Sequence, residues 1–159
     1  MNRPSSSRQF LRAKRSGFSL IELLFVIAIV AIFAAVAGPS FRDFIAAQRI
    51  KTASYDISYT LTYARSEAMK RNSQVVFAPT AGGWQSGWTV KNGTVTLAQH
   101  EPFAALGLSG PTSLTYNSSG RLTAAVPPFA VTSDVSGNVT PRCISVSLSG
   151  LPTSKAGAC

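Results

Sequence analysis

An uninterrupted apolar run near the N-terminus constrains the fold of this chain more than any other feature. Every residue from Leu23 to Ala37 is apolar, and with its first turn the segment extends from Phe18 to Gly38. Its 21 residues, at 1.5 Å per residue, match the roughly 30 Å hydrocarbon core of a bilayer. The sequence therefore predicts a membrane-spanning helix at residues 18–38.

The residues before this run are polar and basic. Residues 1–17 contain five Lys or Arg side chains and no acid. Because positive charge stays on the cytoplasmic side, we expect a cytoplasmic N-terminus and an exported C-terminal part. The leader also inflates the formal charge of +9; the remaining chain has ten basic and six acidic residues, a net +4, which supports a nucleic-acid partner only weakly.

A secretory signal peptide is the alternative interpretation of the apolar run. Such a peptide has a shorter apolar region followed by a small-x-small cleavage site, and Ala35-Val36-Ala37 has that form. The length of the run and the helical pattern beyond it favour a retained helix.

The helical pattern resumes directly after Gly38-Pro39. In a membrane helix such a pair makes a kink, because neighbouring groups can satisfy the carbonyl that proline leaves without a donor. We expect a helix from Phe18 to about Arg71 that ends at Asn72-Ser73, and its continuity at Gly38-Pro39 stays open. Apolar residues three and four apart predict the buried face of its second half: Ile50, Ala53, Ile57, Leu61, Ala64 and Ala68.

From residue 74 onward the apolar pattern has a period of two, which is typical of strands. Asn92-Gly93 suits a tight hairpin turn, because such turns need positive φ. We expect an antiparallel sheet that packs on the apolar helix face, which makes the fold α+β, and an irregular connection within residues 124–141. Strands are predicted at Gln74–Ala78, Trp84–Val90, Thr94–Ala98, Ser113–Tyr116, Arg121–Ala124, Phe129–Thr132 and Cys143–Leu148.

Residues that could support disulfide or enzyme chemistry are few. Cys143 and Cys159 are the two cysteines, and an exported chain can oxidise them to a disulfide. His100 is the single histidine, expected in an exposed loop, and this set is too small for a metal site. No Gly-rich phosphate loop follows a strand, and the acids do not cluster. The sequence thus predicts neither an enzyme nor a cofactor or metal.

The segment Lys14–Leu24, KRSGFSLIELL, closely resembles the class III signal of type IV pilins and type II secretion pseudopilins. The resemblance implies that a prepilin peptidase cuts between Gly17 and Phe18 and methylates the new amino group of Phe18. It also implies that Glu22 serves assembly and that Pro39 is the family's helix-kinking proline. The implied fold is type IV pilin-like, with a long N-terminal transmembrane and amphipathic helix packed on an antiparallel sheet.

Glu22 has a physical rationale independent of the family. A carboxylate in hydrocarbon costs several kcal/mol unless it is paired, and no basic residue of the predicted helix lies near it. Cleavage before Phe18 creates a cation that can pair with Glu22 on the same or a neighbouring helix. In the alternative interpretation, Glu22 reaches the membrane interface from the helix end.

Two further segments, Tyr63–Asn72 and Gly83–Val90, resemble the GspH/FimT group of minor pseudopilins. The two late cysteines, Cys143 and Cys159, resemble the C-terminal disulfide of its FimT/FimU-like members. This resemblance implies a minor subunit that primes assembly near a filament tip. Within these segments, Arg65 and Glu67 are also interpretable as a solvated helix face, with Glu67 and Arg71 forming a pair four residues apart. Trp84 and Trp88 are interpretable as core anchors rather than a ligand platform.

The resemblance leaves three roles open. The first is a structural minor pilin of a type IV pilus, the second an H-type minor pseudopilin of a type II secretion system. The third is a pilus-tip DNA-binding protein, for which Arg121, Arg142 and Lys155 are the candidate phosphate contacts. Two or three such contacts would give weak, salt-sensitive binding.

The predicted organisation has three parts: a removed leader at residues 1–17, a transmembrane and assembly helix at residues 18–38, and a periplasmic pilin-like domain at residues 39–159 that includes the second half of the helix. The resemblance implies a bacterial inner-membrane protein that later enters a pilus or pseudopilus. The implied partners are prepilin peptidase, other major and minor pilins or pseudopilins, the inner-membrane assembly platform and inner-membrane lipids.

Overall fold

The computed structural model of the chain describes residues 18–159. The predicted leader, with Gly17, lies outside the described residues. The chain divides into two compact units, Met1–Gly38 and Pro39–Cys159, and we call the second the head. A single helix, α1 (Leu20–Lys70), starts in the first unit and extends into the head, and its assignment includes Gly38 and Pro39.

The second half of α1 buries the face that the sequence predicts. Ile57, Leu61 and Ala64 are fully buried there, and Ile50, Ala53 and Ala68 are at most 1% exposed. These positions lie three and four residues apart, so they form one face of the helix. Ala at three of the six lets the backbone approach the strands closely, which explains why the face combines small and large side chains.

The C-terminal end of α1 is closed by a left-handed residue. Asn72 has φ of 49°, and the amide of Ser73 donates to the carbonyl of Ala68 at 3.1 Å. This six-to-one bond satisfies a carbonyl that the helix leaves without a donor, and asparagine is one of the few non-glycine residues that tolerate the conformation. The predicted stop at Asn72-Ser73 is therefore confirmed.

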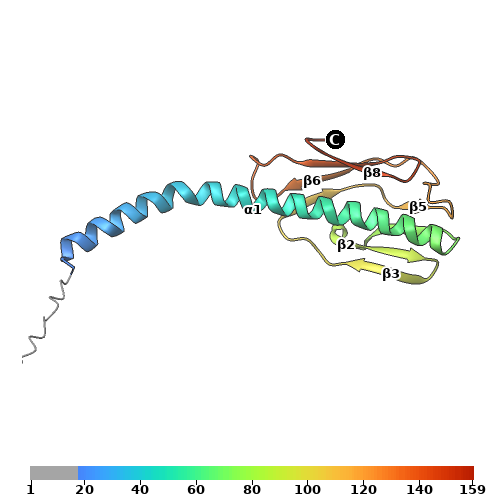
Figure 1. The fold of residues 1–159 in the computed structure, drawn as a ribbon, viewed down its shortest axis with the longest axis horizontal. Coiled ribbons are helices and arrows are strands. Elements are labelled where there is room, and N and C mark those ends of the chain that lie inside the picture. Colours follow the sequence, from blue (N-terminus) through green and yellow to red (C-terminus); the bar gives the residue numbers. More distant parts are fainter. Residues whose placement is uncertain (1–17) are drawn as a thin grey trace, which may run out of the picture. The chain divides into compact units, whose positions relative to one another are not determined.

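The strands of the head form two antiparallel four-stranded sheets rather than one. Sheet A has the order β3-β2-β1-β5 and sheet B the order β4-β6-β7-β8. In Figure 1, β6 and β8 lie on one side of α1, with β2 and β3 on the other. The strands are β1 (Val75–Thr80), β2 (Gly83–Asn92), β3 (Val95–His100), β4 (Leu106–Ser109), β5 (Leu114–Tyr116), β6 (Phe129–Ser133), β7 (Arg142–Val146) and β8 (Pro152–Ala156).

One predicted strand is absent from the structure, and two observed strands were not predicted. Arg121–Ala124 is not a strand and makes only the isolated bridge of Leu122 to Tyr116, because the side-chain oxygen of Asn117 takes up the amides of Ser119 and Arg121 at 3.0 Å each. The edge strands β4 and β8 were missed: β4 alternates Leu106 and Leu108 with smaller residues but is only four residues long, and β8 has no apolar alternation.

Four aromatic rings join the two sheets. Trp84 of β2 and Phe129 of β6 meet edge to face with centroids 4.9 Å apart, and Phe77 of β1 lies 4.9 Å from Trp84 and 5.9 Å from Phe129. Trp88 completes the group beside Phe77 at 5.8 Å. Trp84 is 5% and Trp88 1% exposed, so their predicted role as core anchors is confirmed. The indole nitrogen of Trp84 donates to the carbonyl of Pro111 at 2.8 Å, so burial leaves no polar group unsatisfied.

Near the C-terminal end of α1, the turns at Gly120 and Gly150 are held by hydrogen bonds from Arg65 and Tyr116. Arg65 donates through Nε to the carbonyl of Gly120 at 2.9 Å, and the buried Tyr116 hydroxyl donates to the carbonyl of Gly150 at 3.3 Å. Burial raises the pKa of Tyr116, which therefore stays a neutral donor. Gly150 has φ of 84°, and a β-carbon there would collide with the carbonyl oxygen of Gly120. Glycine is required because both the conformation and the space exclude a side chain.

Replacing Gly150 with Ala should lower the free energy of unfolding of the head by about 1–3 kcal/mol, the usual cost of forced overpacking. The near-ultraviolet signal of the buried tryptophans during denaturation of the detergent-solubilised protein measures this. Gly137→Ala is the matched control, since a β-carbon there meets nothing within 4 Å, and its effect should be close to zero. Equal stabilities of the two variants would contradict the assignment.

Candidate assembly site

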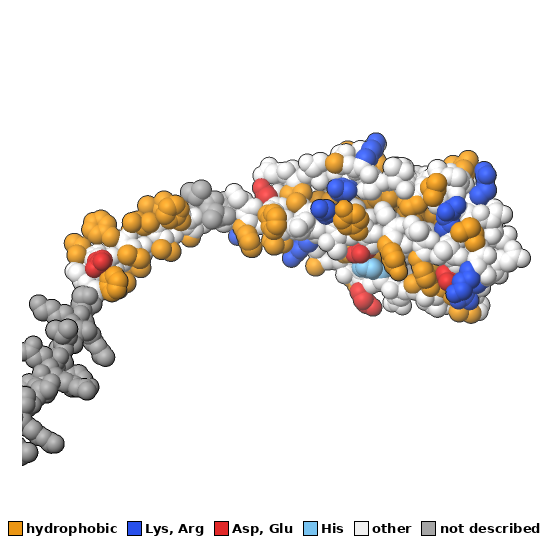
Figure 2. All heavy atoms as spheres, in the orientation of Figure 1, with side chains coloured by type: hydrophobic (Ala, Val, Ile, Leu, Met, Phe, Trp, Pro, Cys, Tyr) orange, Lys and Arg blue, Asp and Glu red, His pale blue; other side chains and the backbone are white. Residues whose placement is uncertain are grey.

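The first part of α1 presents apolar side chains on all its faces. From Leu20 to Phe33 every described side chain is exposed, and the window of highest hydropathy is 0% buried. Figure 2 shows apolar side chains covering this segment. A helix that is apolar all round is stable only in a bilayer or among similar helices. By its length and composition, α1 is the candidate membrane-spanning helix of the described chain.

Glu22 is the single charged residue between Phe18 and Gly38 and lies in the first turn of α1. The first backbone bond there joins the amide of Leu23 to the carbonyl of Ser19 at 3.1 Å. The preceding amides have no acceptor within the helix, so the partial positive charge of the helix end favours an acid at this position. Within residues 18–159 Glu22 forms no ion pair.

Phe18 lies just before α1 and is 79% exposed. Four residues, about one helical turn, separate it from Glu22. A cut before Phe18 would therefore place the new amino group one turn from the carboxylate. Gly17, the other residue of the predicted cut, is not among the described residues. The kink at Gly38 and Pro39 remains a prediction.

Glu67 is not part of a solvated helix face. Its side chain is 9% exposed, Arg71 donates through Nε to its carboxylate at 2.6 Å, and the Lys70 ammonium lies 3.6 Å away. The hydrogen bond from Arg71 is the main reason that the pKa of Glu67 lies below its usual range. The predicted pairing of Glu67 with Arg71, four residues apart, is thus confirmed. Together with the bond from Arg65 to the carbonyl of Gly120, it gives the charged residues of this helix segment a structural role.

The two cysteines form a disulfide, as predicted. Cys143 lies in β7, Cys159 is the last residue, and their Cα atoms are 5.1 Å apart. Between them runs β8, which pairs with β7 from Arg142 opposite Ala156 to Val146 opposite Pro152. The bond therefore closes a 16-residue separation around the edge strand and holds a polar segment that has little apolar surface of its own to bury.

The three basic residues predicted to contact DNA do not gather in one patch. Arg142 and Lys155 lie on paired strands, but Lys155 faces Cys143 directly, so strand alternation turns it to the opposite side of the sheet from Arg142. Arg142 donates to Ser154 at 3.4 Å. Arg121 follows Gly120, which contacts Arg65 near the other end of the head.

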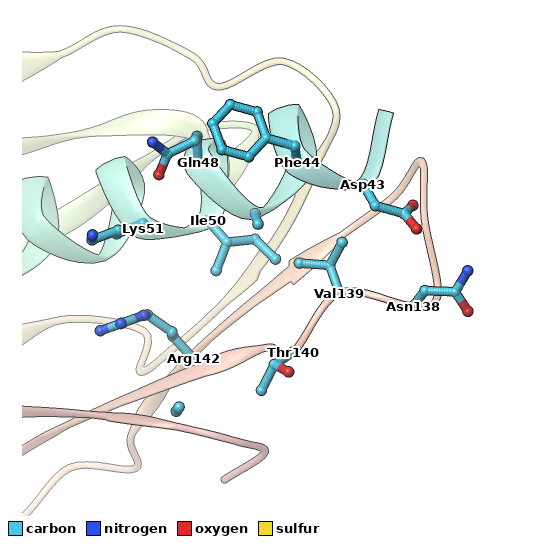
Figure 3. Close-up of a pocket in the computed structure, with 11 residues that line it drawn as sticks. Asp43, Phe44, Gln48, Ile50, Lys51, Asn138, Val139, Thr140 and Arg142 are labelled. Carbon is cyan, nitrogen blue, oxygen red and sulfur yellow. The ribbon is translucent and has the colours of Figure 1, made fainter. Parts of the chain in front are cut away.

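A groove of about 470 Å³ separates α1 from the segment before β7. In Figure 3 Ile50 and Val139 point toward one another, and the longer polar side chains lie around them. Nearby, the hydroxyl of Ser136 donates to the carboxylate of Asp43 at 2.6 Å, which ties the β6–β7 connection to the helix. The sequence gives no signal for this bond, because its partners are 93 residues apart.

His100 was wrongly expected in an exposed loop. It ends β3 and is stacked between Trp88 and Phe103, with centroids at 4.3 and 4.6 Å. Its Nε2 lies 3.6 Å from the carboxylate of Asp56, and its Nδ1 lies 2.7 Å from the carbonyl of Glu101. Among residues 18–159 no cluster of three or more His, Cys, Asp or Glu side chains could hold a metal ion.

A long apolar N-terminal helix whose second half packs on antiparallel sheets defines the type IV pilin-like class of proteins. Two crystal structures of the type IV minor pilin FimU of Pseudomonas aeruginosa share this fold. They match with TM-scores of 0.57 and 0.59 at 21% and 22% identity, covering 67% and 69% of this chain and 95% and 92% of theirs.

Family models match both parts of the chain. The model described as type II transport protein GspH matches residues 54–150, and the prokaryotic N-terminal methylation motif matches residues 12–38. The chain belongs to the GspH family and carries the pilin methylation motif.

Curated relatives agree with this membership. A fimbrial protein of Moraxella nonliquefaciens is 33% identical over 67% of this chain and 69% of its own length. The fimbrial protein EcpB of Eikenella corrodens is 43% identical, but that match covers only 33% of either chain. This chain is therefore a type IV pilin-like protein of the minor pilin and pseudopilin group.

Removing the disulfide with Cys143→Ser and Cys159→Ser should lower the free energy of unfolding by about 3 kcal/mol, because the unfolded chain regains the entropy of the closed loop. Hydrogen exchange should show β8 losing protection while β1 and β2 keep theirs. Reduction of the unaltered protein should reproduce the loss, and reductant should not affect the double variant. A double variant as stable as the oxidised protein would refute this role.

Proposed function

We propose that this chain is a minor pilin that is incorporated into a type IV pilus and primes assembly near its tip. Prepilin peptidase cuts between Gly17 and Phe18 and methylates the amino group of Phe18. Residues 18–38 then anchor the protein in the bacterial inner membrane, with the head in the periplasm. The other pilins and the inner-membrane assembly platform are its partners during extraction.

The observation that carries this proposal is Glu22, one carboxylate on a helix that is otherwise apolar from Leu20 to Ala37. A charge in hydrocarbon is stabilised by a partner of opposite sign. The cut before Phe18 supplies that partner only when the apolar run is kept. The exposed apolar surface of α1 then leaves the bilayer only if other helices of the same kind bury it again, which produces an open helical filament.

Three findings favour a pilus: the disulfide between Cys143 and Cys159, the fold shared with a minor pilin and the fimbrial relatives. The protein's role in this proposal is structural, and no residue is assigned a catalytic step. The apolar helix supports the proposed anchoring, and the basic residues before it support the proposed orientation.

The alternative is an H-type minor pseudopilin of a type II secretion system, and the description of the matching family model favours it. Gene deletion separates the two. Loss of pili with secretion of exoproteins intact supports the pilus subunit, whereas loss of secretion with piliation intact supports the pseudopilin.

The DNA-binding alternative has little support beyond the charge of Arg142, Lys155 and Arg121, which lie on different surfaces of the head. A mobility-shift assay of the processed protein in detergent tests it. A shift at micromolar protein and low salt that Arg142→Gln abolishes would support DNA binding.

Replacing Gly17 with Val should block cleavage, because a side chain at the cut hinders access to the peptide bond. The uncut precursor should accumulate in the inner membrane, detected as an intact Met1 terminus by mass spectrometry. Ser16→Ala, one residue earlier, should be processed normally. A Gly17→Val protein that begins with methylated Phe18 would refute the proposed cut.

Replacing Glu22 with Val should leave processing intact but reduce incorporation into filaments at least about tenfold, which corresponds to the loss of one stabilising charge pair in an apolar environment. Immunoblots of sheared pili, normalised to the processed protein in membranes, measure this. Ser19→Ala, which keeps the charge, is the control. Incorporation of Glu22→Val at the unaltered level would refute the charge-pair argument.

A further inference from the structure

Beyond the anchor and its Glu22, the head has an exposed patch that this function does not use. It consists of Phe41, Arg42, Ile45 and Arg49 of α1 together with Val135 of the β6–β7 connection, and we call it the basal patch. These residues line a shallow hollow of about 360 Å³. Figure 2 shows apolar and basic side chains next to one another at the end of the head where α1 enters it.

The apolar members of the basal patch are held away from the core. Phe41 is 65%, Val135 59% and Ile45 36% exposed. Val135 is kept outward by an ordered loop, since the hydroxyl of Ser133 accepts the amides of Val135 and Ser136 at 3.2 and 3.1 Å. Ser136 in turn donates to Asp43. A preorganised loop that exposes an aliphatic side chain beside an exposed phenylalanine is a surface built for a partner.

The charged side chains that line the patch, Arg42 and Arg49, are both positive. Within the described chain neither Arg42 nor Arg49 forms an ion pair. Of the acids adjacent to the patch, Asp43 accepts from Ser136, and a carboxylate oxygen of Asp134 lies close to Gly107, where an added β-carbon would be 3.0 Å away. Such a patch suits a partner that is both apolar and anionic.

We propose that the basal patch binds the surface of the bilayer in which the chain is anchored, with Phe41, Ile45 and Val135 at the acyl boundary and the two arginines on anionic phosphate headgroups. Phe41 is three residues past Gly38, so the chain holds it within roughly 11 Å of the apolar segment. This tether is short enough for Phe41 to reach the acyl boundary, where amphipathic surfaces insert their apolar face by roughly 5–10 Å. The inference rests on the anchored state of the proposed function.

Tryptophan fluorescence in nanodiscs tests this inference on the full processed chain. Val135→Trp reports on the patch, Phe25→Trp on the anchor, and Leu151→Trp on an equally exposed site beside Gly150 at the other end of the head. Trp84 and Trp88 are buried and give a constant background. The lipids are phosphatidylglycerol or phosphatidylcholine with brominated acyl chains, which quench a tryptophan that reaches the acyl boundary.

The expected result is that phosphatidylglycerol quenches the tryptophan at position 135 by roughly half, consistent with shallow insertion. Quenching at 151 should be absent, and phosphatidylcholine should quench position 135 much less. Adding Arg42→Gln and Arg49→Gln should remove the preference for phosphatidylglycerol, because each arginine accounts for roughly a fivefold gain in association with an anionic surface.

Three results would overturn the inference, each in a distinguishable way. Quenching at position 25 but not at 135 would show that the anchor lies in the bilayer and that the basal patch does not contact it. If position 135 then becomes shielded in assembled filaments, a neighbouring subunit is its partner. Equal quenching at 135 in both lipids would show that binding does not depend on an anionic headgroup. Absence of quenching at position 25 contradicts the anchor, and with it the proposed function.

Discussion

One constraint determines how this protein can be accommodated: the carboxylate of Glu22 is the single charge on the apolar segment of α1 between Phe18 and Gly38. The described structure leaves that carboxylate in the first turn of α1, where backbone amides without acceptors favour it but where no ion pair forms. A helix of this kind is stable in a bilayer or in a bundle of similar helices. In the proposed function, cleavage before Phe18 creates a positive amino terminus one turn away, which allows the helix to join such a bundle.

In the head, the same helix contributes one side of the hydrophobic core. Beyond Pro39, α1 is amphipathic and its buried face closes the core between two antiparallel sheets, which the aromatic group around Trp84 and Phe129 joins. Bonds from Arg65 to Gly120 and from Ser136 to Asp43 fasten loops to opposite ends of the head's helix, and the disulfide fastens the last strand. A well-packed head that follows an apolar helix fits the proposed role as a filament subunit.

The sequence predicts whatever depends on local pattern or covalent chemistry. The helix with its buried face, its stop at Asn72, the hairpin at Gly93 and the disulfide all follow from spacing, turn residues or redox context. It does not predict the second sheet, because apolar alternation locates β6 and β7 but does not say which strands pair, and the polar β8 is held by pairing with β7. The stacked position of His100 depends on the pairing of β3 with β2, and the outward position of Val135 depends on bonds to the Ser133 hydroxyl; apolar periodicity reveals neither.

The central claim is that the carboxylate of Glu22 pairs with the amino nitrogen that cleavage creates on Phe18. A solid-state NMR distance between ¹⁵N-labelled Phe18 and the ¹³C-labelled carboxylate of Glu22, measured in assembled filaments, tests it most directly. The account predicts a nitrogen-to-oxygen separation within about 4 Å, on the same or a neighbouring helix. A carboxylate carbon farther than about 7 Å from every Phe18 nitrogen would contradict it, because no ion pair reaches that far.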